Sequence, residues 1–179
     1  MALTATVYTF EVDLSDVGRG VYETLVFKAA QHPSESDEYL IARALAYCLE
    51  YREGIAFSKG LAEPDEPAIA VRDLTGALQV WIEIGSPDAT RLHKASKAAP
   101  RVVVYTHKDA SRLVQQLSGE RIHRRDDLEI RAIDRELIAA LVTRMDRRMR
   151  FELSVVDQHL YVTIDGETLD GALQRYSAT

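Results

Sequence analysis

Two segments near the N-terminus show the alternation of apolar and polar residues that is typical of half-buried β-strands. Residues 4–12 carry this pattern, and residues 22–28 repeat it. The segment Gly18-Arg19-Gly20 lies between the two runs. Glycines between two such runs indicate a turn, because they adopt backbone conformations that other residues disfavour. The chain is therefore expected to open with two strands that form a hairpin.

The first helix is predicted from a start signal followed by an apolar run at helical spacing. Pro33 stops the preceding strand, and residues 34–38 supply a serine cap and acidic residues for a first turn. The apolar residues among 39–49 recur at helical spacing and cover most of the helix surface. We expect this helix to be largely buried.

Strands and helices alternate along the rest of the chain. The pattern predicts strands at 55–57, 68–71, 78–84, 101–105, 128–133, 151–156 and 160–164, a loop at 60–67, a hairpin turn at 73–76, and helices at 86–98, 109–117 and 134–145. The order hairpin, helix, strand in the middle of the chain indicates one crossover that is helix-linked and parallel. The expected fold class is α/β, in the broad sense of a mixed α+β domain.

Composition narrows the class of protein without changing this picture. The chain has 179 residues, of which 46% are hydrophobic and 28% charged, so it is long enough to bury one core and is expected to form a single domain over residues 1–179. The first residues lack the features of a signal peptide, and no apolar run is long enough to span a bilayer. We therefore expect a cytoplasmic protein with no membrane partner. Cys48, the single cysteine, sits among apolar residues and indicates a buried side chain in a reducing compartment.

The charges are distributed unevenly along the chain. Residues 1–90 carry fifteen acidic and six Lys or Arg residues, whereas residues 91–179 carry thirteen and sixteen. Two basic runs, at 121–125 and 144–150, have two interpretations. They could bind phosphates, or they could form solvated faces neutralised by neighbouring acids, among them Asp126 and Asp127. The second interpretation is the preferred one at this level.

The residues that could carry chemistry gather around the 73–76 hairpin. The sequence has no serine-hydrolase elbow, phosphate-binding loop or zinc spacing, and its five histidines are scattered. A turn at Thr75 and Gly76 would pair residues whose numbers sum to about 151, which brings the loop at 65–66 to the end of the strand that carries Glu83. Alternation places Trp81 and Glu83 on one face.

Carboxylates gathered in this way repel one another unless a cation lies between them. Asp65, Glu66 and Glu83 are therefore predicted ligands of Mg²⁺, which would activate a water for attack on a phosphoryl group. Lys94 is predicted to orient that water, with Arg91 one turn earlier on the same helix face. The alternative is a solvated acidic loop in which Glu83 makes an ordinary ion pair with a lysine.

Five short motifs together resemble the YaeQ family of bacterial proteins over nearly the whole chain. They are Met1-Ala2-Leu3-x-Ala5-Thr6-x-Tyr8, His32-Pro33-Ser34-Glu35, Asp65-Glu66-Pro67, Trp81-Ile82-Glu83-x-Gly85-x-Pro87 and Arg91-x-x-Lys94-Ala95. The resemblance implies a compact variant of the PD-(D/E)xK nuclease fold, which is a restriction-endonuclease-like mixed sheet flanked by helices.

The resemblance also assigns parts of a nuclease motif. Pro64-Asp65 resembles its first part and Glu83 its second, but Gly85 stands where the motif has lysine, and Lys94 is the candidate replacement. Glu35 or Glu38, expected on the first helix, resembles the additional acid of such enzymes.

Two functions remain open at this level. The first is a nuclease or related phosphodiesterase that uses Mg²⁺ or Mn²⁺. The second is a non-catalytic module on the same scaffold that binds nucleic acid, a protein or a small anionic ligand through Arg91, Lys94 and the later arginines.

Overall fold

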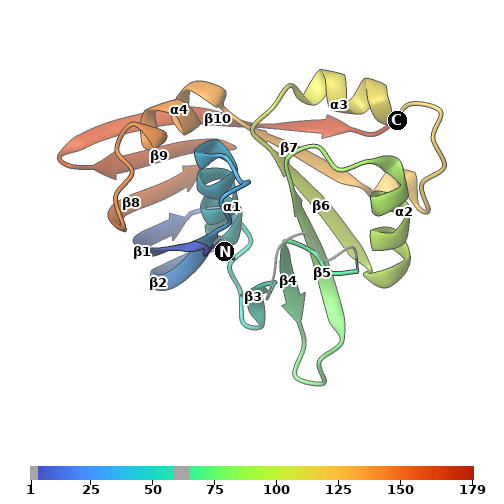
Figure 1. Cartoon of the computed structure of the whole chain (residues 1–179), viewed down its shortest axis with the longest axis horizontal. Coiled ribbons are helices and arrows are strands. Elements are labelled where there is room, and N and C mark those ends of the chain that lie inside the picture. The colour runs from blue at the N-terminus through green and yellow to red at the C-terminus, as the bar shows by residue number, and fades with distance from the viewer. Residues whose placement is uncertain (1–3, 59–64) are drawn as a thin grey trace. The chain divides into compact units, whose positions relative to one another are not determined.

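The chain folds into two compact units, each assembled from segments that are distant in sequence. The computed structural model describes residues 4–58 and 65–179, and the elements are labelled in Figure 1. Unit 1 comprises residues 1–49 and 133–174, and unit 2 comprises residues 50–132 and 175–179. None of the helices in the described part of the chain combines the length and apolar character that crossing a membrane requires.

Unit 1 is a mixed sheet packed against helices. Its strands lie in the order β2-β1-β8-β9-β10, and all pairs among them with a described register are antiparallel except β1 with β8. Helix α1 packs against β1, β2 and helix α4. The elements are β1 (Thr6–Asp16), β2 (Val21–Gln31), α1 (Asp37–Leu49), α4 (Arg135–Val142), β8 (Arg148–Val156), β9 (His159–Ile164) and β10 (Glu167–Ser177), whose last residues belong to unit 2.

The core of unit 1 follows from the predicted alternation. Phe10, Val12 and Leu14 point inward from β1 and are at most 2% exposed, whereas the residues between them are partly exposed. Helix α1 is buried along most of its length and carries Cys48, which is fully buried. Burial raises the pKa of the Cys48 thiol far above its ordinary value, so the side chain behaves as a small apolar group.

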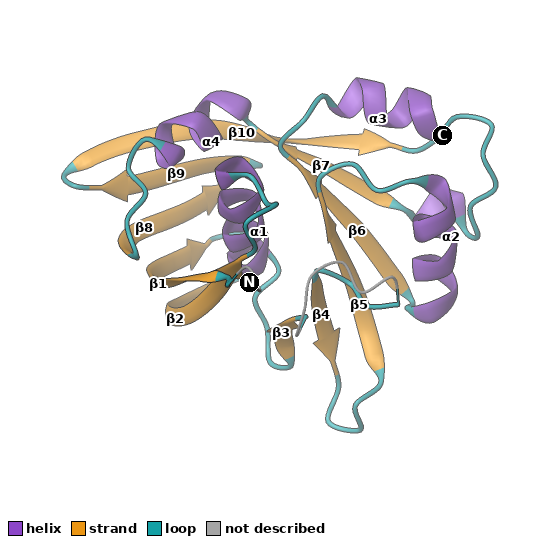
Figure 2. Ribbon diagram, in the orientation of Figure 1, coloured by secondary structure: helices purple, strands orange, loops and turns teal. Residues whose placement is uncertain are grey.

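Unit 2 holds the other five strands of the same ten-stranded sheet, with two helices and one short 3₁₀ turn. Figure 2 shows its helices and strands. Its strands lie in the order β7-β6-β5-β4-β3; β5, β6 and β7 are parallel, and the hairpins to β4 and β3 are antiparallel. The elements are β3 (Ile55–Phe57), β4 (Ile69–Arg72), β5 (Leu78–Ile84), α2 (Ala89–Ala98), β6 (Arg101–Thr106), α3 (Ala110–Leu117), η1 (Arg125–Asp127) and β7 (Glu129–Ile133).

One face of this sheet packs on its helices around a single apolar cluster. Trp81 from β5, Leu92 from α2, Val104 from β6 and Leu113 from α3 are each at most 1% exposed there. The predicted helix-linked crossover is confirmed, because β5 and β6 flank α2 and pair in parallel. The mixed α+β class is thus confirmed in both units.

Some boundaries differ from the prediction. Helix α2 begins at Ala89 rather than at residue 86 or 87, because Asp88 supplies the N-cap. Helix α4 ends at Val142, and β8 begins at Arg148, three residues earlier than expected. The whole of β10 was absent from the prediction. In addition, Glu35 lies in the turn before α1 and not on the helix.

Candidate functional site

Glu83 lies at the end of β5, on the face that the sequence indicated. Ile69 pairs with Ile82 and Ala70 with Trp81, so the predicted register of the hairpin is confirmed. The Glu83 side chain is only 6% exposed. A carboxylate this deeply buried must be neutralised or hydrogen-bonded, because removing an unpaired charge from water is costly.

Arg91 and Trp81 satisfy both oxygens of this carboxylate. The Nε of Arg91 donates to Oε2 at 2.8 Å, and its Nη2 lies 2.8 Å from Oε1. The indole Nε1 of Trp81 also donates to Oε1, at 2.7 Å. The guanidinium carbon lies 5.6 Å from the centre of the Trp81 ring. The result is a fork-like, charge-assisted pair closed on one side by an aromatic ring.

The start of α2 places Arg91 against Glu83. The Asp88 side chain accepts a hydrogen bond from the backbone N–H of Arg91 at 2.8 Å, which fixes the first helical turn. Between the strand and this cap, Gly85 adopts a φ of 89°. A residue with a Cβ is strained in that conformation, so the motif position that carries lysine in the nucleases has a backbone here that favours glycine.

The other predicted site residues are arranged differently from the expectation. Lys94 forms an ion pair with Asp65 rather than with Glu83, and both side chains are more than half exposed. Glu66 contributes its backbone carbonyl, which accepts from Arg91 Nη2 at 2.7 Å. Pro64 lies outside the described residues.

These contacts do not assemble the predicted cation site. Within residues 4–58 and 65–179, no group of three His, Cys, Asp or Glu side chains is arranged to hold a metal ion. Arg91 neutralises Glu83 and Lys94 neutralises Asp65, so Asp65, Glu66 and Glu83 do not gather around a common point, and their role as metal ligands stays a prediction. The alternative of an ordinary ion pair at Glu83 agrees with this geometry, although the partner is arginine rather than lysine.

Glu35 and Glu38 belong to unit 1. The Glu35 carboxylate lies 3.4 Å from Arg43 and its side chain is 9% exposed, whereas Glu38 is exposed in the first turn of α1. The resemblance assigned one of them a place in the nuclease site; in this structure Glu35 forms a local ion pair.

The basic run at 121–125 divides into inward and outward groups. Arg124 Nη2 donates to the carbonyls of Ser96 and Ala99 at 2.7 Å each and so closes the end of α2. Arg125 donates to carbonyls around the end of α3, among them that of Glu120 at 2.8 Å. No ion pair in the described part of the chain joins these arginines to Asp126 or Asp127. These two arginines therefore contact backbone carbonyls rather than the neighbouring acids, and the self-neutralised face stays a prediction.

Sequence reasoning missed four residues that the fold brings together. His93 and Lys97 lie on α2, and Arg121 and His123 lie in the segment after α3; we call these four side chains the α2 cationic cluster. The backbone N–H of His123 donates to His93 Nδ1 at 3.0 Å. The only signal in the sequence was the His93-x-x-x-Lys97 spacing, which places both residues on one helix face.

A second polar cluster in unit 2 is held together by several ion pairs and hydrogen bonds, although the buried Nε of Arg131 has no hydrogen-bond partner among the described residues. Glu50 is 3% exposed and accepts from Arg101 Nη1 and from the hydroxyl of Tyr105, at 2.6 Å each. Arg101 and Arg131 also donate to Glu129, at 2.6 and 2.9 Å. Burial and the Glu50 charge raise the pKa of Tyr105 well above its ordinary value. These groups join β6 to β7 and serve the fold.

Comparisons with known proteins agree in pointing to one family. A family model described as "YaeQ protein" matches residues 1–172. The protein named "Uncharacterized protein YaeQ" of Escherichia coli (strain K12) is 29% identical over 171 residues, which are 95% of this chain and 94% of that protein.

Two solved structures have the same fold. The crystal structure of YaeQ protein from Pseudomonas syringae has a TM-score of 0.86 at 30% identity and covers 97% of this chain and 96% of its own. The YaeQ protein from Xanthomonas axonopodis pv. citri has a TM-score of 0.87 at 31% identity, covering 98% of this chain and 100% of its own. The similarity extends over both units.

Proposed function

Because the chain belongs to the YaeQ family and its buried Glu83 is saturated by Arg91 and Trp81, we propose that the protein binds nucleic acid without cleaving it. The single observation that carries this proposal is the occupancy of both Glu83 oxygens. A nuclease of the PD-(D/E)xK type needs this carboxylate for a metal ion that activates water. Here the guanidinium of Arg91 occupies the position that a metal ion would need at Glu83.

Two further features support the proposal. The φ of Gly85 disfavours a lysine at the motif position, so the catalytic set lacks its usual third member on the strand. Nucleic acid as the ligand is supported by the resemblance to a restriction-endonuclease-like scaffold and by the surplus of basic residues in the second half of the chain.

The second candidate is the metal-dependent nuclease, and one observation favours it. Asp65 and Lys94 are in contact, and Glu83 belongs to the same unit. The residues as arranged do not fit Mg²⁺ or Mn²⁺, because Arg91 already neutralises the charge of Glu83 and Lys94 that of Asp65. Cleavage would first require Arg91 to leave Glu83, so we derive no reaction step through a metal.

The test measures binding and cleavage on the same substrates. Fluorescently labelled single- and double-stranded DNA and RNA are titrated with protein at low salt, and the products are resolved after incubation with Mn²⁺. We expect saturable binding, intact oligonucleotides and no saturating heat when Mn²⁺ is titrated into the protein. Cleavage that is lost in both Glu83→Gln and Lys94→Ala would establish the nuclease instead. Absence of binding to every oligonucleotide would reject the proposed function.

A further inference from the structure

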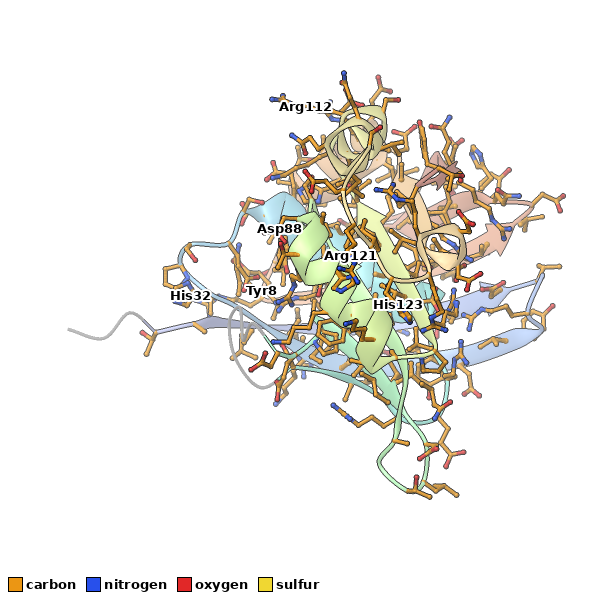
Figure 3. All side chains as sticks on the ribbon, turned by 90° about the vertical axis from the view of Figure 1, so that its right-hand side faces the viewer. Tyr8, His32, Asp88, Arg112, Arg121 and His123 are labelled. Atoms are coloured by element: carbon orange, nitrogen blue, oxygen red, sulfur yellow. The ribbon has the colours of Figure 1, made fainter. Side chains whose placement is uncertain are left out.

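Two members of the α2 cationic cluster form no ion pair with a carboxylate in the part of the chain that the structure describes. Lys97 lies in the last turn of α2 and is exposed, as is Arg121. No ion pair in residues 4–58 and 65–179 involves either side chain. Figure 3 shows Arg121 and His123 near each other beside α2. By contrast, the guanidinium of Arg124 donates to backbone carbonyls of this unit, so it is less available to a ligand than Lys97 and Arg121.

The two histidines of the cluster are fixed relative to each other. The His123 backbone N–H donates to His93 Nδ1, and the two rings meet edge-on, with centroids 6.4 Å apart and planes at 89°. Because Nδ1 accepts this bond, the proton of the neutral His93 ring is on Nε2. Nε2 is thus a donor, and His93 shares its helix face with Lys97 one turn on.

The electrostatics of His93 show that positive charge accumulates at this point. Partial removal from water lowers the pKa of His93, and the charges of Lys97, Arg121 and His123 lower it further. Among the residues that the structure describes, no acidic group contributes to the pKa shift of this ring. A place where several cations act on one another without an acid favours an anion.

We infer that His93, Lys97, Arg121 and His123 form a binding site for the phosphate groups of nucleic acid. This inference rests on the proposed function and assigns it to one surface of unit 2. Lys97 and Arg121 supply the two full charges, and the arginine can donate to a phosphate through two N–H groups. His93 Nε2–H supplies a neutral donor, and the exposed His123 ring offers a flat surface for stacking against a base.

The number of charges sets the expected salt dependence. Two phosphate contacts give a slope of log K against log salt of about −1.8 on duplex DNA. Raising the salt from about 50 to about 200 mM should therefore weaken binding by about tenfold. A protein that coated nucleic acid non-specifically through many lysines would show a much steeper slope.

The decisive variant removes both charges and is compared with a matched control. In Lys97→Gln/Arg121→Gln we expect affinity for a labelled oligonucleotide to fall about tenfold or more and the salt slope to approach zero. The control Lys28→Gln/Arg148→Gln removes the same charge from unit 1, where both exposed residues lie opposite Thr9 on neighbouring strands and make no ion pair in the described part of the chain. Its affinity should stay within about twofold of the wild type, as expected for charges outside the site.

The outcomes separate the site from the function. Equal losses in the two double variants, or none in either, would overturn the cluster while leaving nucleic-acid binding intact. No binding by the wild type would reject the proposed function itself, and the site with it. Inorganic phosphate added at constant ionic strength should not displace the oligonucleotide. If free phosphate displaced the oligonucleotide at a concentration equal to that of the oligonucleotide's own phosphate groups, the cluster would be a site for free phosphate, and the inference would be overturned.

Discussion

Arg91 gives Glu83 what a metal ion would otherwise give a buried carboxylate. Its Nε and Nη2 each approach one oxygen at 2.8 Å, and Trp81 adds a third donor. The pair is buried on the carboxylate side, because Glu83 is 6% exposed and Arg91 24%. Removing one partner of such a pair leaves a charge with no compensation, which costs more than the pair itself contributes.

We therefore expect Arg91→Met to lower the free energy of unfolding by about 3 kcal/mol, measured by urea denaturation. The exposed Arg112→Met on α3 is the control and should change it by less than about 0.5 kcal/mol. Adding Glu83→Gln to Arg91→Met should restore part of the loss, since a neutral amide is less costly to bury. A loss in Arg91→Met no larger than in the control would contradict the role of Arg91.

The α2 cationic cluster predicts a measurable change in the titration of one histidine. The pKa of His93 should lie below its ordinary value of 6.5, and Lys97→Gln should raise it by removing a repulsive charge. Imidazole proton shifts in NMR measure both. Lys94→Gln is the matched control on the same helix, and it should leave His93 unchanged because Asp65 already offsets the Lys94 charge. An unchanged pKa of His93 in Lys97→Gln would contradict the geometry of the cluster.

At the residue scale, sequence spacing located the site but not its contacts. The hairpin register could be derived from the turn, and it placed Glu83 beside Trp81 correctly. Arg91 and Lys94 lie three residues apart on one helix face, so spacing alone cannot decide which of them reaches Glu83. The cap at Asp88 decides it, because α2 then begins at Ala89 and Arg91 falls in its first turn.

At the scale of elements, charged pairs join the parallel strands β6 and β7. Tyr105 lies opposite Arg131, and Val103 lies opposite Glu129, so Arg101, Tyr105, Glu129 and Arg131 share one face of the sheet. Partial burial by itself would raise the pKa of Glu129, but the hydrogen bonds and charges of Arg101 and Arg131 outweigh it, and the pKa lies below its ordinary value.

This shift has a definite sign in the stability of the protein. A carboxylate with a lowered pKa in the folded state contributes stability above its unfolded pKa of about 4.5, and this contribution is lost as pH falls through the folded value. In Glu129→Gln the decline of stability below about pH 4.5 should therefore be shallower than in the wild type. Urea denaturation at a series of pH values measures it, with the exposed Glu152→Gln as control. Parallel pH profiles of wild type and Glu129→Gln would count against the shift.

The strand that the pattern missed contains a glycine with a packing role. β10 has few β-branched residues and carries Asp170 and Gly171 at its centre, so it resembles a loop. A Cβ at Gly171 would lie 2.6 Å from the Cβ of Asp134 and 3.0 Å from that of Leu137. The glycine thus allows the start of α4 to approach the strand, a long-range requirement that no local pattern reveals.

Gly171→Ala is accordingly expected to destabilise the protein by about 1–3 kcal/mol, because the Asp134 and Leu137 side chains and their helix must shift. Thermal unfolding measures the effect. Gly18→Ala is a suitable control, since the nearest atom to its Cβ would be 3.9 Å away. If both variants melt alike, α4 does not limit this position.

At the scale of the whole molecule, the predicted single domain over residues 1–179 remains a prediction. The chain crosses between the two compact units after residues 49, 132 and 174, so neither unit is a continuous segment. The parallel pairing of β1 with β8, which joins Thr9 to Arg148, could not be derived from local patterns. Pairings this distant in sequence depend on loop closure and on the packing of the complete chain.

Because Cys48 is buried, the rate at which its thiol is modified reports on the opening of unit 1. A thiol reagent can modify this side chain only when α1 leaves its sheet, and the single tryptophan, Trp81, reports on unit 2 in the same molecule. If the chain is one cooperative domain, the opening free energy from thiol-labelling rates should equal the unfolding free energy from tryptophan fluorescence. A clearly lower opening free energy from thiol labelling would mean that unit 1 opens while unit 2 stays folded.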